Sequence, residues 1–252
     1  PTLISNAIKD GSFFKSPVLL QLMDNAKSGA LHLIGLLSDG NVHSHLDHFI
    51  AVIEEAERQN IQKCYIHALL DGRDVGIQTA DLYIDKLQQV FTRIMSEHSD
   101  WDYAFASAGG REVITMDRDL NWSKVEAGWK THVLGKSGNN FSSALEAVEK
   151  FRSEKEGLVD QDCPPFNIIG KDGEVPIINS GDSVLMMNFR ADRAIEITRA
   201  FTEKDFSGFS IDKRPDVVFA GMMVYDEDSD MPENRIIGSP EVKNPFGKRM
   251  VD

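Results

Sequence analysis

Basic charge, cysteine and long apolar runs are all scarce in this chain. Lys and Arg number 27 against 40 Asp and Glu, which gives a formal net charge of -13. Sequence-independent binding to nucleic acid or to an anionic membrane needs a basic face, so we expect neither as a partner. The only cysteines, Cys64 and Cys163, indicate no disulfide framework, and Cys64 lies in an apolar run typical of a buried thiol. No apolar stretch approaches the ~18 residues of a membrane span and no signal peptide is visible, which predicts a cytoplasmic protein.

Several glycine-rich loops that mark common enzyme classes are also missing. The sequence contains no Walker A loop, no G-x-G-x-x-G and no G-x-S-x-G nucleophile elbow. These absences argue against a kinase and against a dinucleotide-binding enzyme.

Six short apolar runs, bounded by Gly, Asp or Asn, are typical of strands that are covered on both faces. They lie at Leu31–Leu37, Lys63–Leu70, Tyr103–Ala108, Phe166–Ile169, Ser183–Phe189 and Val217–Tyr225. Amphipathic helical patterns begin between them at Ser44, near Thr79, near Ser142 and at Asp192, and Leu120–Gly138 is also expected to be helical. The polar segments Glu154–Pro165 and Asp226–Pro240 are expected to be surface loops. Alternating strands and helices predict a three-layer α/β domain with a mainly parallel central sheet flanked by helices.

Charged side chains follow the ends of four of these runs. The phrases are Asn41-Val-His43-Ser-His45, Asp71-Gly-Arg73-Asp74, Gly110-Arg111 with Asp117-Arg118, and Asn188-Phe-Arg190-Ala-Asp-Arg193. In an open α/β sheet, ligands bind outside the carboxyl ends of the strands. Guanidinium groups gathered there suit carboxylates and phosphates, because they are always charged and offer bidentate hydrogen bonds. The sequence therefore predicts a site for a small, multiply charged anion.

The histidines of the first phrase also allow a metal site, because H-x-H at a strand end is a common start for a Zn or Mn ligand set. If Ser44 caps the helix, however, His45 and His48 share a helix face while His43 belongs to the preceding turn. Downstream histidines do not complete the set, since His67 lies in a strand and His98 and His132 are expected at the surface. We expect no metal ligand here and place His43 at the strand-end crevice.

Asp74 is a candidate general base beside the candidate anion ligand Arg73. Gly72 permits a tight turn, and Asp74 could accept a proton from a substrate hydroxyl. A solvated turn with a local Arg–Asp pair is an equally good interpretation. In the last phrase, Arg190 and Arg193 on a first helical turn would oppose the helix dipole, which indicates an anion site. Ion pairs with Asp192 and Glu196 are the alternative.

Together these phrases resemble cofactor-independent phosphoglycerate mutase, the 2,3-bisphosphoglycerate-independent, metal-dependent enzyme of the alkaline phosphatase superfamily. The similarity rests on Leu36–His45, His67–Asp74, Met116–Asp119 and Asn188–Ala194, and it extends from about Leu31 to Pro240. Arg111 and Arg118 are one residue further apart than in many bacterial members. The regions Trp122–Lys150 and Asp226–Pro240 look more like the plant and trypanosomatid branch.

The resemblance implies a two-domain enzyme of which this chain is the substrate-binding (phosphotransferase) domain. It implies that phosphoglycerate is bound by His43, Arg73, Asp74, Arg111, Arg118, Arg190 and Arg193. Asp74 is then expected to exchange protons with the glycerate hydroxyls. The nucleophilic serine and two Mn²⁺ or Mg²⁺ ions are implied to belong to the other domain of the same parent chain, and no 2,3-bisphosphoglycerate is needed. The parent is expected to be a monomer that interconverts 3- and 2-phosphoglycerate in glycolysis and gluconeogenesis through a phosphoserine, whereas this fragment alone is expected to be inactive.

The chain starts at Pro1 rather than at a methionine, and we expect it to be a piece of a longer protein. We expect a linker and N-terminal helical segment at 1–30, the substrate-binding domain at 31–240, and a C-terminal linker to the absent metal-binding domain at 241–252. Two alternatives stay open. One is a self-contained metal-dependent hydrolase that uses His43, His45 and His48, and the other is a non-catalytic anion-binding module.

Overall fold

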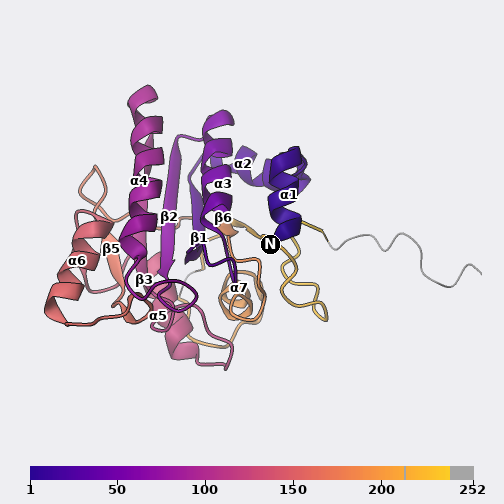
Figure 1. The fold of residues 1–252 in the computed structure, drawn as a ribbon. Helices are drawn as coiled ribbons and strands as arrows, with labels where there is room; N and C mark the ends of the chain where they lie inside the picture. Colours follow the sequence, from indigo (N-terminus) through magenta and orange to yellow (C-terminus); the bar gives the residue numbers. More distant parts are fainter. Residues whose placement is uncertain (213, 239–252) are drawn as a thin grey trace, which may run out of the picture.

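Seven strands form one sheet in the part of the chain that this computed structural model describes, residues 1–212 and 214–238. The strand order is β4-β5-β3-β2-β1-β6-β7 (Figure 1). The five strands from β3 to β7 in this order are parallel, whereas β5 runs antiparallel to β3 and pairs in parallel with β4. The strands are β1 (Leu31–Leu37), β2 (Lys63–Leu70), β3 (Asp102–Gly110), β4 (Asn140–Phe141), β5 (Phe166–Ile168), β6 (Ser183–Met186) and β7 (Val218–Gly221). The predicted three-layer α/β architecture with a mainly parallel sheet is confirmed.

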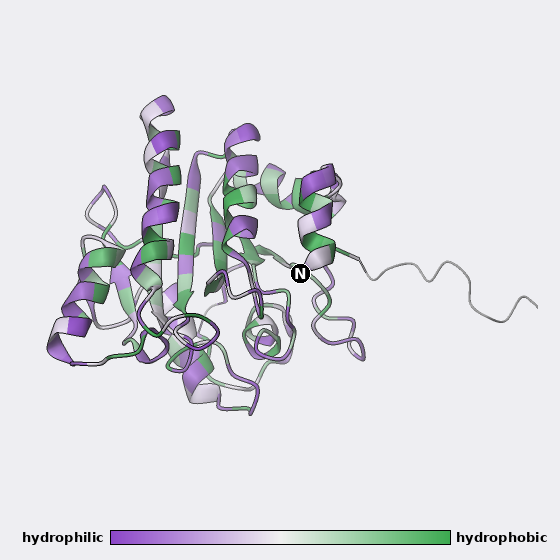
Figure 2. Cartoon of the chain, in the orientation of Figure 1, coloured by the Kyte–Doolittle hydropathy of each residue, from purple (hydrophilic) through white to green (hydrophobic). Residues whose placement is uncertain are grey.

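Helices cover both faces of the sheet, because alternate strand residues point to opposite sides and both sides are apolar. In β1, Leu31 and Leu33 pack in the larger core with the helices of one layer, whereas Ile34 packs with the residues of the other. Figure 2 shows green along the strands and mixed purple and green on α3 and α4, as expected for helices with one buried face. The first layer contains α1 (Thr2–Asp10), α2 (Pro17–Ala26), α3 (Leu46–Arg58), α4 (Ala80–Glu97) and α6 (Ala144–Glu154), and the second contains α5 (Trp122–His132) and α7 (Ile195–Thr202).

The N-terminal helices contribute to the larger core. A short 3-10 helix, η1 (Phe13–Lys15), joins α1 to α2, and α2 contacts β6 and β7. Ile4, Phe13 and Leu22 are fully buried with strand and helix residues of the first layer. Residues 1–30 therefore pack on the sheet along α1 and α2.

The boundaries of several elements differ from the prediction. β6 ends at Met186 rather than Phe189, and β7 ends at Gly221 rather than Tyr225. The buried Tyr225 hydroxyl lies 2.6 Å from the Asn188 carbonyl oxygen and 3.1 Å from that of Met186. A side chain therefore bonds the carbonyl groups at the end of β6, where the backbone pairing of the sheet stops. Likewise α3 is capped by His45, because the Ser44 hydroxyl bonds the carbonyl of β1 residue Leu36 instead.

Glu154–Pro165 was predicted to be a surface loop, and this prediction is wrong for the middle of the segment. Residues Asp160–Asp162 form the 3-10 helix η2, and Asp160 is buried. Its Oδ2 accepts the backbone N–H groups of Thr79 and Ala80, both at 2.8 Å, at the start of α4. Asp160 is buried, although it lies in a polar segment, because it accepts the free N–H groups at the start of a helix that is remote in the sequence.

In the segment predicted as a loop at Asp226–Pro240, the residues described are mostly exposed or half-buried. Ile236 is an exception, since it is buried and its N–H bonds the Gly221 carbonyl. The linker predicted at 241–252 lies outside the described residues. Within them, no helix has both the length and the apolar character needed to cross a membrane.

Candidate functional site

Four loops at one edge of the sheet carry the predicted site residues. β3, β2, β1 and β6 are neighbours and parallel, so the loops that follow them leave at the same edge, to which the β2 arrowhead points in Figure 1. The loop after β1 carries His43, the loop after β2 carries Arg73 and Asp74, the loop after β3 carries Arg111 and Arg118, and the loop after β6 carries Arg190 and Arg193. We call these seven residues, together with Glu112 and Asp192, the charged edge.

Asp71 organises the loop after β2. Its Oδ1 accepts the backbone N–H groups of Arg73 and Asp74, each at 3.1 Å, and its Oδ2 accepts the Ser38 hydroxyl at 2.6 Å. Ser38 follows β1, so this carboxylate ties the first two loops together. Gly40 of the same loop approaches so closely that a Cβ there would lie 2.9 Å from the Asp74 carbonyl oxygen. The position of Asp74 is therefore fixed from both sides.

Arg111 is the most deeply buried arginine of the charged edge, with 1% of its surface exposed. Its Nη1 donates to Asp71 Oδ1 at 2.9 Å and to Asp74 Oδ2. Burial works against the charge, but the bonds to Asp74 and Asp71 outweigh it and raise the pKa of Arg111. The Asp74 side chain keeps 15% exposure, enough to meet a ligand hydroxyl while Arg111 holds its carboxylate in one orientation.

Glu112 gathers cations from several elements. Its carboxylate lies 3.2 Å from Arg73 Nη1, 3.3 Å from Arg193 Nη1 and 3.5 Å from Lys124 Nζ of α5. Arg111 Nε lies 4.0 Å away. Burial opposes ionisation of Glu112, yet Lys124, Arg193 and the other two arginines together hold its pKa below the ordinary value. One carboxylate thus joins three loops and a helix.

Asp192 is a second meeting point, on the more exposed side. It lies 3.1 Å from Arg190 Nε, 3.5 Å from Arg118 Nη1 and 3.6 Å from His43 Nδ1. Burial and then the positive charge of Arg111 lower the pKa of His43 to about 4, so His43 is neutral at pH 7. About half of the Arg118 and Arg190 side chains is exposed, which leaves both free to turn onto a ligand.

The charged edge suits a small anion. The ion pairs of the charged edge, with Asp71 and Lys124 beside it, connect six cations to four carboxylates, an excess of two positive charges in a chain of net charge -13. The cations are Arg73, Arg111, Arg118, Lys124, Arg190 and Arg193, and the carboxylates are Asp71, Asp74, Glu112 and Asp192. A ligand with a carboxylate and a phosphate could replace the internal partners of the exposed arginines.

The helix-dipole argument for Arg190 and Arg193 is wrong, because α7 begins at Ile195 and both residues precede it. Arg193 instead donates from Nη1 to the Met116 carbonyl at 3.0 Å. Asp192 does pair with Arg190, as the alternative interpretation held, but Glu196 accepts the N–H of Leu120.

His43, His45 and His48 do not form a ligand set. His45 Nδ1 accepts the Asp47 N–H as the cap of α3, and His48 is buried, with Nε2 3.0 Å from the Ser5 hydroxyl and its ring edge against Phe189. Only His43 faces the charged edge. The prediction that His132 lies at the surface is also wrong, since it is 1% exposed and bonds Ser107 and Thr115.

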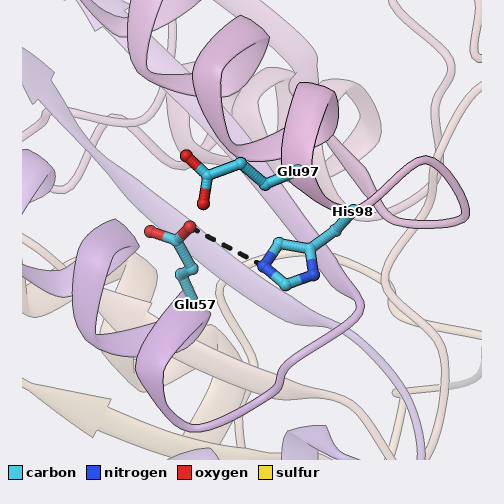
Figure 3. Close-up of side chains that lie close together, drawn as sticks. All are labelled: Glu57, Glu97 and His98. Atoms are coloured by element: carbon cyan, nitrogen blue, oxygen red, sulfur yellow. Dashed lines mark ion pairs between the residues drawn. The ribbon is translucent and has the colours of Figure 1, made fainter.

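One other group in the described part of the chain has the composition of a metal site. Glu57, Glu97 and His98 come together at the ends of α3 and α4, with Glu57 Oε1 3.8 Å from His98 Nε2 (Figure 3). Arg93 already occupies Glu57, because both Glu57 oxygens accept from its guanidinium, at 3.0 and 2.8 Å. The group is best explained as a surface ion-pair network.

The sequence missed residues that organise the site rather than contact a ligand. Asp71 is the first residue of the phrase Asp71-Gly-Arg73-Asp74. An aspartate directly after a strand often forms an Asx turn, and this pattern is the signal that identifies it. Asp192 was considered only as an ion-pair partner of the arginines beside it in the sequence. Glu112 and Lys124 gave no local signal, because most of their partners come from other elements.

Comparison with known proteins agrees with this geometry. A family model described as "BPG-independent PGAM N-terminus" matches residues 4–227. The chain is 44% identical over 251 residues to a "Probable 2,3-bisphosphoglycerate-independent phosphoglycerate mutase" of Leptospira interrogans, covering 98% of this chain and 45% of that protein. It is 41% identical to the 2,3-bisphosphoglycerate-independent phosphoglycerate mutase of Trypanosoma brucei brucei, covering 96% of this chain and 44% of that protein.

A solved structure shows the same relationship. The phosphoglycerate mutase of Leishmania mexicana, crystallised at low cobalt concentration, superposes with a TM-score of 0.90 at 40% identity, covering 96% of this chain and 44% of that one. The chain thus spans less than half the length of these relatives.

Proposed function

The chain belongs to the family of 2,3-bisphosphoglycerate-independent phosphoglycerate mutases as their N-terminal part, and on that premise we propose that it holds the glycerate portion of the substrate while 3- and 2-phosphoglycerate interconvert. The names of its relatives support both the substrate and the independence from 2,3-bisphosphoglycerate. The parent is proposed to act as a cytoplasmic monomer. Its substrate-binding domain would be 31–240, with 1–30 packed on it and 241–252 as a linker.

The observation that carries the proposal is the meeting of arginines from three loops, with the neutral His43 of a fourth loop, at Glu112 and Asp192. Phosphoglycerate carries a carboxylate and a phosphate on a three-carbon body, and fixed guanidinium groups on several sides can hold both ends at once. Glycerate is held while the phosphoryl group is removed and returned, so the reaction stays intramolecular. Such positioning of the reactants can lower the activation barrier by a large amount. The buried members Arg111 and Arg193 define the site, and the exposed Arg118 and Arg190 close onto the ligand.

Asp74 is proposed to exchange the proton of the glycerate hydroxyls. Arg111 orients its carboxylate and the Asp71 carboxylate fixes its backbone, so it can meet a hydroxyl without rearranging. The neutral His43 stands across the site and can bond the same ligand without adding charge.

We propose that the phosphoryl acceptor and the two Mn²⁺ or Mg²⁺ ions lie in the part of the parent protein beyond this chain. The donor set fits this assignment, because both oxygens of Glu57, in the group Glu57, Glu97 and His98, already accept from Arg93, and the charged edge is dominated by guanidinium groups. Bound metal would supply electrostatic stabilisation of the transferring phosphoryl group. The residues of this chain bind and orient glycerate and shield it from water.

Calorimetric titration of this chain with 3-phosphoglycerate tests the proposal. We expect one weak site and no turnover. Arg190→Ala removes a charge-assisted contact and should weaken binding at least tenfold, since such contacts contribute about 1.5–3 kcal/mol. Arg93→Ala, which removes an equally exposed arginine from a surface network, should leave the affinity unchanged. Absence of binding to wild type, or equal binding by Arg190→Ala, would contradict the proposal.

A further inference from the structure

A chain of buried hydrogen bonds crosses the sheet on the face that α5 covers. Six residues take part, each no more than 5% exposed. In order they are Asp182, His32, His67, Ser107, His132 and Thr115. We call them the histidine chain. It begins beside β6, away from the charged edge, and ends in the loop that carries Arg111 and Arg118.

The fold lines these residues up. His32, His67 and Ser107 stand on β1, β2 and β3, which are neighbours, and His67 is the register partner of Ser107 just past an irregularity in the pairing. His132 is the last residue of α5, which packs on this face. Three imidazoles in a sheet interior are unusual, because buried polar groups are costly unless bonded.

Every ring nitrogen of the three histidines has a partner. His32 Nε2 lies 3.2 Å from Asp182 Oδ2, and His32 Nδ1 lies 2.9 Å from His67 Nε2. His67 Nδ1 and His132 Nδ1 each lie 2.7 Å from the Ser107 hydroxyl. His132 Nε2 lies 3.0 Å from the Thr115 hydroxyl.

The direction of the hydrogen bonds along the histidine chain is assigned from its Asp182 end. Burial works against ionisation of Asp182, but its hydrogen bonds lower its pKa, so it accepts from His32 Nε2–H. Burial lowers the pKa of His132 to about 3 and that of His67 well below the ordinary value. We assign His32 as a donor to Asp182 through Nε2 and an acceptor at Nδ1, so that each imidazole of the chain accepts through one nitrogen and donates through the other. The Thr115 hydroxyl therefore donates to His132.

Thr115 needs such a tether. Its φ of 67° is left-handed, which a β-branched residue rarely adopts. Its N–H bonds the Lys124 carbonyl, and α5 approaches so closely that a Cβ on Gly128 would lie 2.0 Å from its Oγ1. The next residue, Met116, offers the carbonyl that receives Arg193. The conformation of Thr115 thus sets where one arginine of the charged edge is held.

We propose that the histidine chain is a positioning device for the charged edge. By accepting the Thr115 hydroxyl, it holds the segment 111–118 in the conformation that places Arg111, Glu112 and the Met116 carbonyl. The effect on ligand binding rests on the proposed function, whereas the effect on the segment does not. Thr115 and His132 act through the arginines and do not touch the substrate.

Thr115→Val tests the tether, because valine keeps the β-branched shape and replaces the hydroxyl with a methyl group that cannot donate a hydrogen bond. Thr115→Ser keeps the hydroxyl and is the matched control. Hydrogen–deuterium exchange of 111–118 should rise at least fivefold in Thr115→Val, and the dissociation constant for 3-phosphoglycerate should rise by a similar factor. Thr115→Ser should match wild type in both. Wild-type exchange in Thr115→Val overturns the proposal. If wild type binds no phosphoglycerate, the proposed function fails while the exchange result still decides this inference.

Histidine ¹⁵N spectra of this chain provide a second readout that loss of packing would not mimic. Wild type should show the Nε2–H tautomer for His32 and His67 and the Nδ1–H tautomer for His132. In Ser107→Ala, His132 loses its acceptor at Nδ1 and should change to Nε2–H, bonding Thr115 in the reverse direction, while His67 stays unchanged. A wild-type pattern other than this, or an unchanged His132 in Ser107→Ala, overturns the proposal even if Thr115→Val does not fold.

Discussion

Each cation of the charged edge is held by a carboxylate of the same chain. Glu112 holds Arg73, Arg193 and Lys124, and Asp192 holds Arg118 and Arg190. Without such partners, guanidinium groups this close together would repel one another, and the buried one, Arg111, would carry an uncompensated charge. A substrate anion therefore competes with internal carboxylates. The cost of displacing them is one physical reason to expect weak binding by this chain.

The depressed histidine pKa values predict acid-sensitive stability. His43 and His48 both have a pKa near 4 in the folded state, mainly because of burial, against about 6.5 when unfolded. Between these values the unfolded chain binds more protons, so the free energy of unfolding falls as the pH drops from 6.5 to 4. Each histidine contributes a slope of up to about 1.4 kcal/mol per pH unit. Urea unfolding at pH 7.5, 6 and 5 measures the decline.

His48→Gln is the control for that series, because the amide can still bond Ser5 but does not titrate. Its stability should fall less steeply below pH 6.5 than that of wild type. A free energy of unfolding that stays constant from pH 7.5 to pH 5 would show that the buried histidines titrate normally.

The sequence located the arginines but, apart from the local pair of Arg190 and Asp192, not their partners. Arg73, Arg111 and Arg190 were found because each follows an apolar run, and parallel strands deliver their ends to one edge. The pairing of Glu112 with Arg193 joins residues 81 positions apart, and no local pattern encodes it. The surface assignment of His132 failed for the same reason, since Ser107 and Thr115 satisfy it only in the folded chain.

Among the elements, α4 depends on a residue that is remote in sequence. Asp160 of η2 accepts two N–H groups at the start of α4 and also the Arg152 guanidinium at 2.8 Å. Asp160→Ala should lower the free energy of unfolding by about 3 kcal/mol, because two backbone donors and a cation lose their partner. The neighbouring Asp162→Ala should change it by less than ~0.5 kcal/mol, since Asp162 is exposed. Equal effects in the two variants, measured by urea unfolding, would rule out this role.

The existence of the predicted strands and helices was easier to infer than their ends. β1 and β2 begin and end at the predicted residues, because continuous apolar runs between polar turns define them fully. β6 stops early where Tyr225 takes up its last carbonyls, and α7 starts late, after the loop that presents Asp192. The two-residue β4 is too short to leave a periodic signal. Tertiary contacts set these boundaries.

At the scale of the whole molecule, the sheet topology is what makes the site. Because β3, β2, β1 and β6 are parallel neighbours, four loops from residues 38 to 193 meet at one edge. The chain nevertheless spans under half the length of its relatives. Under the proposed function, its charged edge binds and orients the substrate and does not itself transfer the phosphoryl group. Phosphoryl transfer is therefore expected only when the rest of the parent protein faces this edge.

A crystal structure of this chain grown with saturating 3-phosphoglycerate tests the binding site most directly. We predict ligand density at the charged edge, with its carboxylate and phosphate contacted by arginines from at least three of the four loops and a glycerate hydroxyl within hydrogen-bond distance of Asp74. Arg118 and Arg190 should have turned away from Asp192 onto the ligand. Density only at another surface, or an empty charged edge at saturating ligand, would contradict the assignment of this edge as the phosphoglycerate site.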